Sequence, residues 1–185
     1  MIDQQQTPGD AVMTRIGQAA MLLHGGDREE ARHRFASIWA EISDAGDPLH
    51  LCTLAHYMAD AQDDPDDELA WDLRALAAAE EQSEAGGESR SEARGESQSG
   101  VGGEGLSGAR GEGRTAGHEQ SLAVRALYPS LHLDLAADYI KLRRPEAARA
   151  HLDRARAATE ALADDGYGNG VRAAIDRLER TLGAG

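Results

Sequence analysis

Two short segments of this chain align with each other without gaps, and this internal repeat constrains the fold more than any other feature of the sequence. Residues 49–57 and 131–139 share Leu, His, Leu, Ala and Tyr in the same register. Each copy is followed by a proline, Pro65 or Pro145, that can occupy the first turn of a second helix. A helix that recurs together with its successor is typical of helical hairpins that stack on one another. We therefore expect an all-α fold.

Apolar residues recur at helical spacing on both sides of the repeat copies. Hydrophobic residues make up 41% of the chain but aromatic residues only 4%, so the expected core consists mainly of Ala and Leu, which favour closely packed helices. The pattern predicts two hairpins within residues 11–84, and a third hairpin with a final helix within residues 119–185. Pro129 is expected to break or kink a short helix over residues 119–127. The predicted core stripes include Ile16, Leu23, Ala31, Phe35, Ile38, Leu54, Leu69, Leu73, Leu76, Val171, Ile175 and Leu182.

The segment between these two parts, residues 85–118, has a different composition. Gly, Ser, Glu and Arg fill nearly all of it, and Val101 and Leu106 are its only large apolar residues. So little apolar surface does not offset the entropy lost on ordering. We therefore expect a disordered linker over residues 85–118 and a disordered N-terminus over residues 1–10.

The overall charge excludes several classes of partner. The formal net charge is −14, and such an acidic surface repels both nucleic-acid phosphates and anionic lipid headgroups. The first residues lack the basic and apolar regions of a signal peptide, so we expect a cytoplasmic protein. Lys141 is the only lysine, and this preference for arginine indicates a GC-rich genome such as that of an actinobacterium.

The third predicted hairpin resembles a tetratricopeptide repeat. Its residues Ala136, Tyr139, Ala148, Leu152 and Ala155 follow the spacing of small and large residues in that family. The resemblance implies a short right-handed superhelix of about three antiparallel hairpins, with the last helix as a solubilising cap. Tyrosines in this family fill the gaps between neighbouring helices, where alanines allow close contact.

The resemblance also implies a function, because such arrays bind peptides along the concave groove formed by the first helices of their hairpins. The chain would then be a non-enzymatic adaptor or regulatory protein that binds a peptide or helix of a partner protein. A homodimer formed through the same groove is the alternative. By register, the groove would be lined by Leu51, Cys52, Ala55, Met58, Leu133, Asp134, Ala137, Ile140 and Lys141.

A few residues suggest chemistry of another kind. Cys52, His56 and Asp60 are four residues apart and share one helix face, as three zinc ligands could. A small-ligand or metal-binding sensor built on Cys52 and His56 is therefore the alternative function, although no matching ligand pair occurs elsewhere. His50 and His132 occupy equivalent positions in the two repeat copies, and we interpret both as structural histidines. The sequence shows no catalytic constellation and no cofactor motif, so we expect no enzyme activity.

Overall fold

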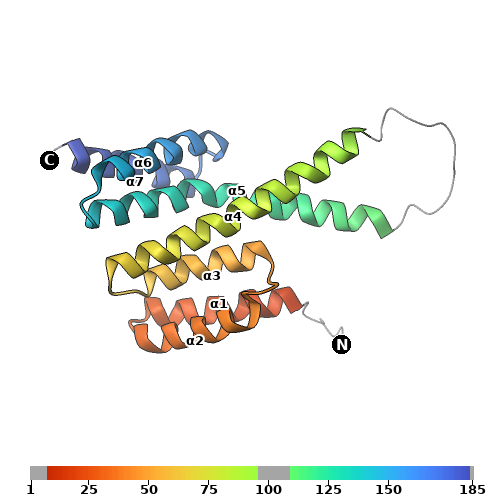
Figure 1. Ribbon diagram of the computed structural model, residues 1–185, viewed down its shortest axis with the longest axis horizontal. Helices are drawn as coiled ribbons and strands as arrows, with labels where there is room; N and C mark the ends of the chain where they lie inside the picture. The colour runs from red at the N-terminus through yellow and green to blue at the C-terminus, as the bar shows by residue number, and fades with distance from the viewer. Residues whose placement is uncertain (1–7, 96–108, 184–185) are drawn as a thin grey trace.

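The computed structural model describes the backbone of residues 8–95 and 109–183, and within these ranges every regular element is a helix (Figure 1). The all-α prediction is confirmed for these residues. The elements in chain order are α1 (Pro8–His24), α2 (Arg28–Ile42), α3 (Pro48–Asp60), α4 (Pro65–Gly95), α5 (Ala109–Lys141), α6 (Pro145–Ala158), a 3₁₀ turn η2 (Thr159–Ala161) and α7 (Gly166–Gly183).

Acidic caps and prolines determine where the early helices begin. The Asp47 carboxylate accepts a hydrogen bond of 2.8 Å from the backbone N–H of Leu49, and Pro48 lies in the first turn of α3. At the start of α4, the Asp64 carboxylate accepts a hydrogen bond of 2.9 Å from the backbone N–H of Asp66. These bonds satisfy backbone donors that have no partner within the helix.

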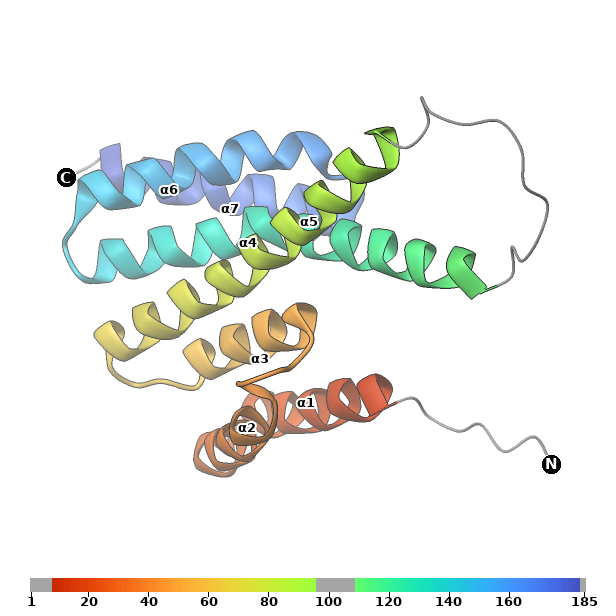
Figure 2. The same ribbon diagram turned by 45° about the vertical axis from the view of Figure 1, so that its right-hand side comes forward.

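Consecutive helices pair as antiparallel hairpins. Helix α1 packs on α2, α3 on α4 and α5 on α6, while α7 covers α5 and α6. The odd-numbered helices also contact one another in order, α1 with α3, α3 with α5, and α5 with α7 (Figure 2). The predicted pairing of helices into hairpins is therefore present, and α3 lies in the middle with neighbours on both sides.

Buried apolar side chains form a nearly continuous core along this stack. Alanines are frequent among them and allow close approach of neighbouring helices. The clusters, in order along the stack, are Ile16, Ala19, Ala20, Ala31, Phe35, Ile38, Leu54, Met58 and Ala61, then Cys52, Ala55, Leu69, Ala75, Leu76, Ala78, Ala79, Val124, Leu131 and Leu135, then Ala136, Leu152, Ala155, Val171 and Ile175.

The repeated tyrosines both pack against neighbouring helices. Tyr57 on α3 stacks on Phe35 of α2 with ring centroids 5.9 Å apart. Tyr139 on α5 lies against His151 of α6, with centroids 5.4 Å apart. Both tyrosines are only partly exposed. The expected role of these rings as fillers between helices agrees with these contacts.

The structure describes only the two ends of the segment 85–118 that we predicted to be a disordered linker. Helix α4 continues to Gly95 and α5 begins at Ala109, so the backbone is helical at both ends of the segment 85–118. Both helices extend beyond the packed hairpins on the same side of the molecule (Figure 1). The prediction of disorder for residues 96–108 concerns a part of the chain outside the described residues. The same is true of residues 1–7, while Pro8 already begins α1.

Of the break or kink expected at Pro129, the break is absent, because Pro129 lies inside α5 and is fully buried. Local side-chain hydrogen bonds support the chain around it. The Ser130 hydroxyl donates to the Leu127 carbonyl at 2.8 Å. The Tyr167 hydroxyl of α7 lies 3.2 Å from the Ala126 carbonyl. Tertiary packing and these bonds offset the cost of the missing proline donor.

Candidate functional site

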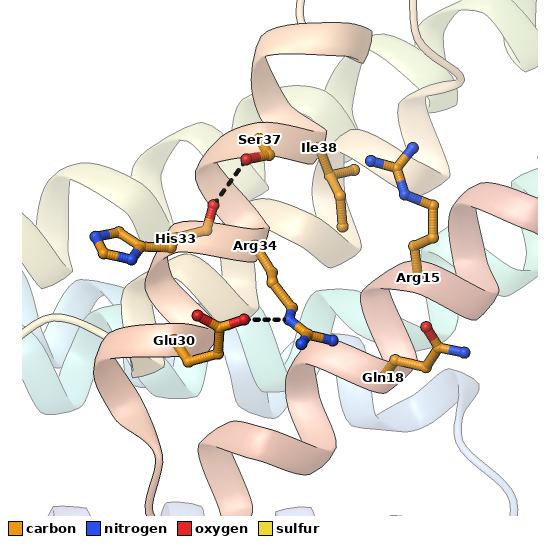
Figure 3. A pocket seen from close by; sticks show the side chains of 7 residues that line it. All are labelled: Arg15, Gln18, Glu30, His33, Arg34, Ser37 and Ile38. Atoms are coloured by element: carbon orange, nitrogen blue, oxygen red, sulfur yellow. Dashed lines mark hydrogen bonds and ion pairs between the residues drawn. The ribbon is translucent and has the colours of Figure 1, made fainter.

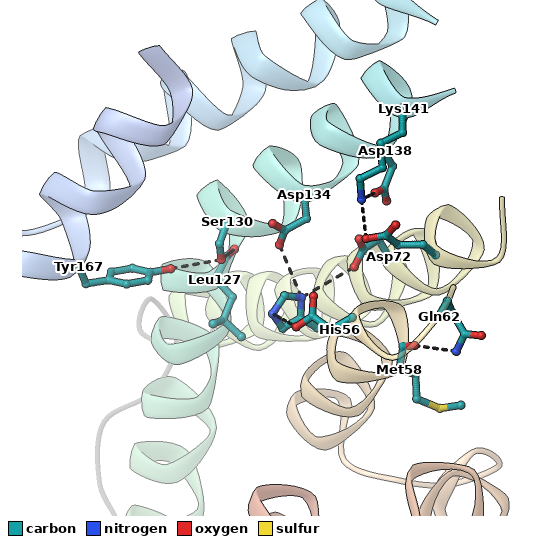
Figure 4. A network of polar contacts seen from close by, with 12 residues as sticks. His56, Met58, Gln62, Asp72, Leu127, Ser130, Asp134, Asp138, Lys141 and Tyr167 are labelled. Carbon is teal, nitrogen blue, oxygen red and sulfur yellow. Dashed lines mark hydrogen bonds and ion pairs between the residues drawn. The ribbon is translucent and has the colours of Figure 1, made fainter. Parts of the chain in front are cut away.

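A cluster of ionisable side chains lies where α3, α4 and α5 meet (Figure 4). Helices α3 and α4 each contribute two of these side chains, and α5 contributes three. Within each helix they are three or four residues apart and therefore lie on the same face. We call this set the acidic cluster. It consists of His56, Asp60, Glu68, Asp72, Asp134, Asp138 and Lys141.

Lys141 holds one end of the acidic cluster together. Its Nζ atom donates to Glu68 Oε1 of α4 at 2.6 Å and to Asp138 Oδ1 of its own helix at 3.1 Å. Burial lowers the pKa of Lys141, but the hydrogen bonds to Glu68 and Asp138 outweigh this and raise it. This end therefore contains an ammonium group bound by carboxylates from two helices.

His56 lies at the other end, and its contacts are longer. Its Nδ1 atom is 3.5 Å from Asp134 Oδ2 and 3.8 Å from Asp72 Oδ1, while Nε2 is 4.0 Å from Asp60 Oδ2. These are ion-pair distances and exceed hydrogen-bond length. Four buried atoms of the cluster accordingly have no hydrogen-bond partner, namely His56 Nδ1, Asp72 Oδ1, Asp134 Oδ2 and Asp138 Oδ2.

Burial and crowding of the carboxylates shift the protonation of the cluster. The pKa of Asp72 is raised to about 8, mainly because burial disfavours its charged form. Burial likewise raises the pKa of Asp134 to about 6. Burial lowers the pKa of His56, but Asp72, Asp134 and Asp60 together overcome this and raise it to about 9. At neutral pH the cluster therefore holds an imidazolium among carboxyl groups, and these groups carry more protons than they would in water.

The structure corrects part of the predicted groove. Cys52 and Ala55 are completely buried and Met58 is 6% exposed, so these residues do not line an open surface. The reason is that α3 is covered on both sides, by α1 and α2 and by α4 and α5. The remaining predicted groove residues are at least partly exposed, namely Leu51, Leu133, Asp134, Ala137, Ile140 and Lys141.

The structure does not favour the predicted metal site at Cys52, His56 and Asp60. His56 and Asp60 do approach each other, but the Cys52 thiol is buried in the core, and burial raises its pKa to about 12. A metal ligand must be a thiolate, which this environment disfavours. In the part of the chain that the structure describes, no group of three or more His, Cys, Asp or Glu side chains has a geometry suited to a metal ion.

The repeated histidines have the structural surroundings that we expected of them. His132 is 8% exposed, and its Nδ1 atom lies 3.1 Å from Nδ1 of His151 on α6. Burial, together with the positive charge of His151 and Arg154, lowers the pKa of His132 to about 4. The pair is therefore uncharged at neutral pH, and one imidazole donates to the other. His50 is half-buried.

Sequence reasoning missed Glu68, Asp72 and Asp138 as members of the site. A signal for Asp72 was present, because Asp72 lies three residues after Leu69 and four before Leu76. The prediction that Leu73 faces the core is wrong, since Leu73 is 42% exposed and its neighbour Asp72 is buried instead. Asp138 follows Asp134 by one helical turn. A carboxylate on a core-facing position is unusual enough to indicate a specific role.

A pocket of about 300 Å³ between α1 and α2 is a second candidate site (Figure 3). Its two guanidinium groups already have carboxylate partners. Arg34 Nε donates to Glu30 at 2.7 Å, and Arg15 donates to both carboxylate oxygens of Glu41 at 2.6 and 2.7 Å. An anionic ligand would have to displace these carboxylates, so the pocket is the weaker candidate. It is lined by Arg15, Gln18, Glu30, His33, Arg34, Ser37 and Ile38.

No known family model, curated protein or solved structure matches this chain significantly. Among the described helices, none has the length and apolar character that a bilayer crossing requires. The physical arrangement of the site therefore carries the functional argument.

Proposed function

We propose that this chain is a non-enzymatic protein–protein interaction module that binds a peptide or helix of a partner protein along the face formed by α1, α3 and α5. The observation that supports this most directly is the contact of α1 with α3 and of α3 with α5, in chain order. In a tetratricopeptide-like array, the first helices of successive hairpins line a groove in this way. The hairpin pairing and the packed tyrosines agree with such an array.

The partly exposed residues on α3 and α5 suit an amphipathic partner. Leu51, Leu133 and Ile140 offer apolar contacts, while Asp134 and Lys141 lie on the same helices as charged groups. An amphipathic helix buries its apolar side in such a groove and places polar groups against charged rims.

The burial and the raised pKa of Cys52, the only cysteine of the chain, support a non-catalytic role. A nucleophilic or metal-binding cysteine has to be accessible and to ionise near neutral pH. Cys52 is buried and its pKa is raised to about 12. A sensor built on Cys52 and His56 is therefore less well supported than a binding module.

Selection of binding peptides from a random peptide library, with the full-length protein as bait, tests this function. The variant Ala137→Arg places a bulky side chain on the proposed face of α5. Ala173→Arg makes the same change at an exposed position of α7 and is the matched control. We expect Ala137→Arg to weaken a selected peptide at least about tenfold, which corresponds to about 1.4 kcal/mol, and Ala173→Arg to leave its affinity unchanged.

Circular dichroism and the unfolding midpoint confirm that both variants are folded. A selection that yields no binding peptide contradicts the proposed function. Equal affinities for the two arginine variants would contradict the proposed face.

A further inference from the structure

The charges of the acidic cluster do not balance. It contains five carboxyl groups, of which Asp72 keeps its proton at neutral pH because its pKa is raised to about 8, and its cations are His56 and Lys141. The guanidinium of Arg28 on α2 is bound to the Asp60 carbonyl at 2.6 Å and to the Asp63 carboxylate at 3.2 Å. The described part of the chain therefore supplies less positive charge to this cluster than its carboxylates can bind.

Buried oxygens without partners show that the cluster lacks hydrogen-bond donors as well as charge. Asp72 is 3% exposed and Asp138 is 1% exposed, yet Asp72 Oδ1 and Asp138 Oδ2 have no hydrogen-bond donor apart from a proton shared between these two carboxyl groups. Asp134 Oδ2 has no hydrogen-bond donor. Figure 4 shows the carboxylates of Asp72 and Asp134 pointing toward the His56 ring. Buried carboxylate oxygens in folded proteins normally have donors.

The end of the cluster around His56 is accessible from outside. The side chains of His56, Asp60 and Asp134 are 35%, 48% and 34% exposed, respectively. They belong to α3 and α5, the helices of the proposed binding face. We call these three residues the His56 end. The Lys141 end shows how the same cluster binds a cation, with one ammonium held by carboxylates of α4 and α5.

We propose that the His56 end binds a lysine or arginine side chain of the partner segment, held between the carboxylates of Asp60 on α3 and Asp134 on α5. This inference rests on the proposed function, since it names the chemistry that the partner presents to the binding face. A guanidinium or ammonium supplies positive charge and hydrogen-bond donors at the exposed edge of these two carboxylates. The acidic net charge of the whole chain also attracts a basic segment.

Binding of a cation at this place is linked to pH. The bound side chain competes with the protons on His56, whose pKa is raised to about 9, and on Asp134, whose pKa is raised to about 6. Asp72 and Asp138 face the same space and also retain protons. We therefore expect affinity to increase as the pH rises from about 6 to about 9, the range between these pKa values.

The library selection described above also tests this inference, with two further variants of the full-length chain. The double variant Asp60→Asn/Asp134→Asn removes the negative charges of the His56 end without changing side-chain size. The control Glu80→Gln/Glu81→Gln removes the same charge from exposed positions on α4. Selected peptides are expected to share a basic residue. Their affinity is expected to fall at least about tenfold in the first variant and less than about twofold in the control.

Three results would overturn the inference while leaving the proposed function intact. Selected peptides without a shared lysine or arginine would do so, as would an unchanged affinity for the Asp60→Asn/Asp134→Asn variant. An equal loss in both double variants would show a general attraction to an acidic surface. An affinity that falls between pH 6 and pH 9 contradicts the competition with protons on Asp134 and His56. A selection without any binding peptide contradicts both proposals together.

Discussion

At the scale of single residues, Asp72 links the burial of the acidic cluster to the charge of His56. It is a carboxyl group on a core-facing position of α4, 3% exposed, with His56 Nδ1 at 3.8 Å. Burial of a carboxylate without donors is costly, and proteins reduce this cost by retaining the proton or by placing a cation nearby. Both effects are present here, since the pKa of Asp72 is raised to about 8 and that of His56 to about 9.

Substitution of Asp72 by Asn tests this coupling directly. The amide keeps the shape of the side chain but removes the charge that favours the imidazolium, so we expect the pKa of His56 to fall from about 9 toward its ordinary value. An NMR titration of the histidine ring signals measures this. His132 on α5 serves as internal control, because its lowered pKa depends on burial, His151 and Arg154. A His56 pKa that does not respond to the substitution contradicts the coupling.

At the scale of helices, the sequence predicted hairpins well because local signals define their ends. Pro65 begins α4 as expected, with Asp64 as its cap, and Asp47 with Pro48 begins α3 in the same way. The break expected at Pro129 does not occur, because burial of Pro129 and the hydrogen bonds of Ser130 and Tyr167 near it depend on tertiary structure, which a local sequence pattern does not contain.

The candidate site was predicted only in part, for a related reason. His56, Asp60, Asp134 and Lys141 were named from helix register alone. The register also placed Cys52 in the groove, because it cannot show that α3 is covered on both sides. Which face of a central helix remains open depends on all its neighbours, and that information is tertiary.

Close contact between helices depends on alanines, and this gives a second prediction. Ala136 on α5 is completely buried in the cluster that joins α5, α6 and α7. Enlarging it to leucine would force the helices apart, so Ala136→Leu is expected to lower the free energy of unfolding by about 1–3 kcal/mol. Urea denaturation measures the change. The control is Ala137→Leu at the adjacent, partly exposed position, for which little change is expected. Equal effects of the two leucines would contradict this packing.

At the scale of the whole molecule, the acidic cluster joins the N-terminal hairpins to the C-terminal helices. Its members on α3 and α4 precede the segment 96–108 in the chain, and those on α5 follow it. The charges of the acidic cluster therefore contribute to the stability of the interface between these two parts.

The raised pKa values give the pH dependence of folding a definite sign. A group whose pKa is higher in the folded than in the unfolded state stabilises the fold below its unfolded pKa, and this contribution is lost as the pH rises through its folded pKa. For His56 the loss runs from about 6.5 to about 9, and for Asp72 from about 3.8 to about 8. His132 acts oppositely, because its pKa is lowered to about 4, and its contribution is lost as the pH falls from 6.5 toward 4.

We therefore expect the free energy of unfolding to decrease between pH 6.5 and pH 9, the interval in which His56 and Asp72 release protons in the folded state. Urea denaturation at several pH values measures this slope.

The double variant His56→Gln/Asp72→Asn lacks both titrating groups and should show a much flatter profile over the same interval. His132→Phe should retain the slope above pH 6.5 and change the profile only at lower pH, since the neutral pair with His151 is already formed above that value. A wild-type free energy of unfolding that stays constant or rises between pH 6.5 and pH 9 would contradict this prediction. It would show that the carboxyl groups of the acidic cluster are better solvated than their burial indicates.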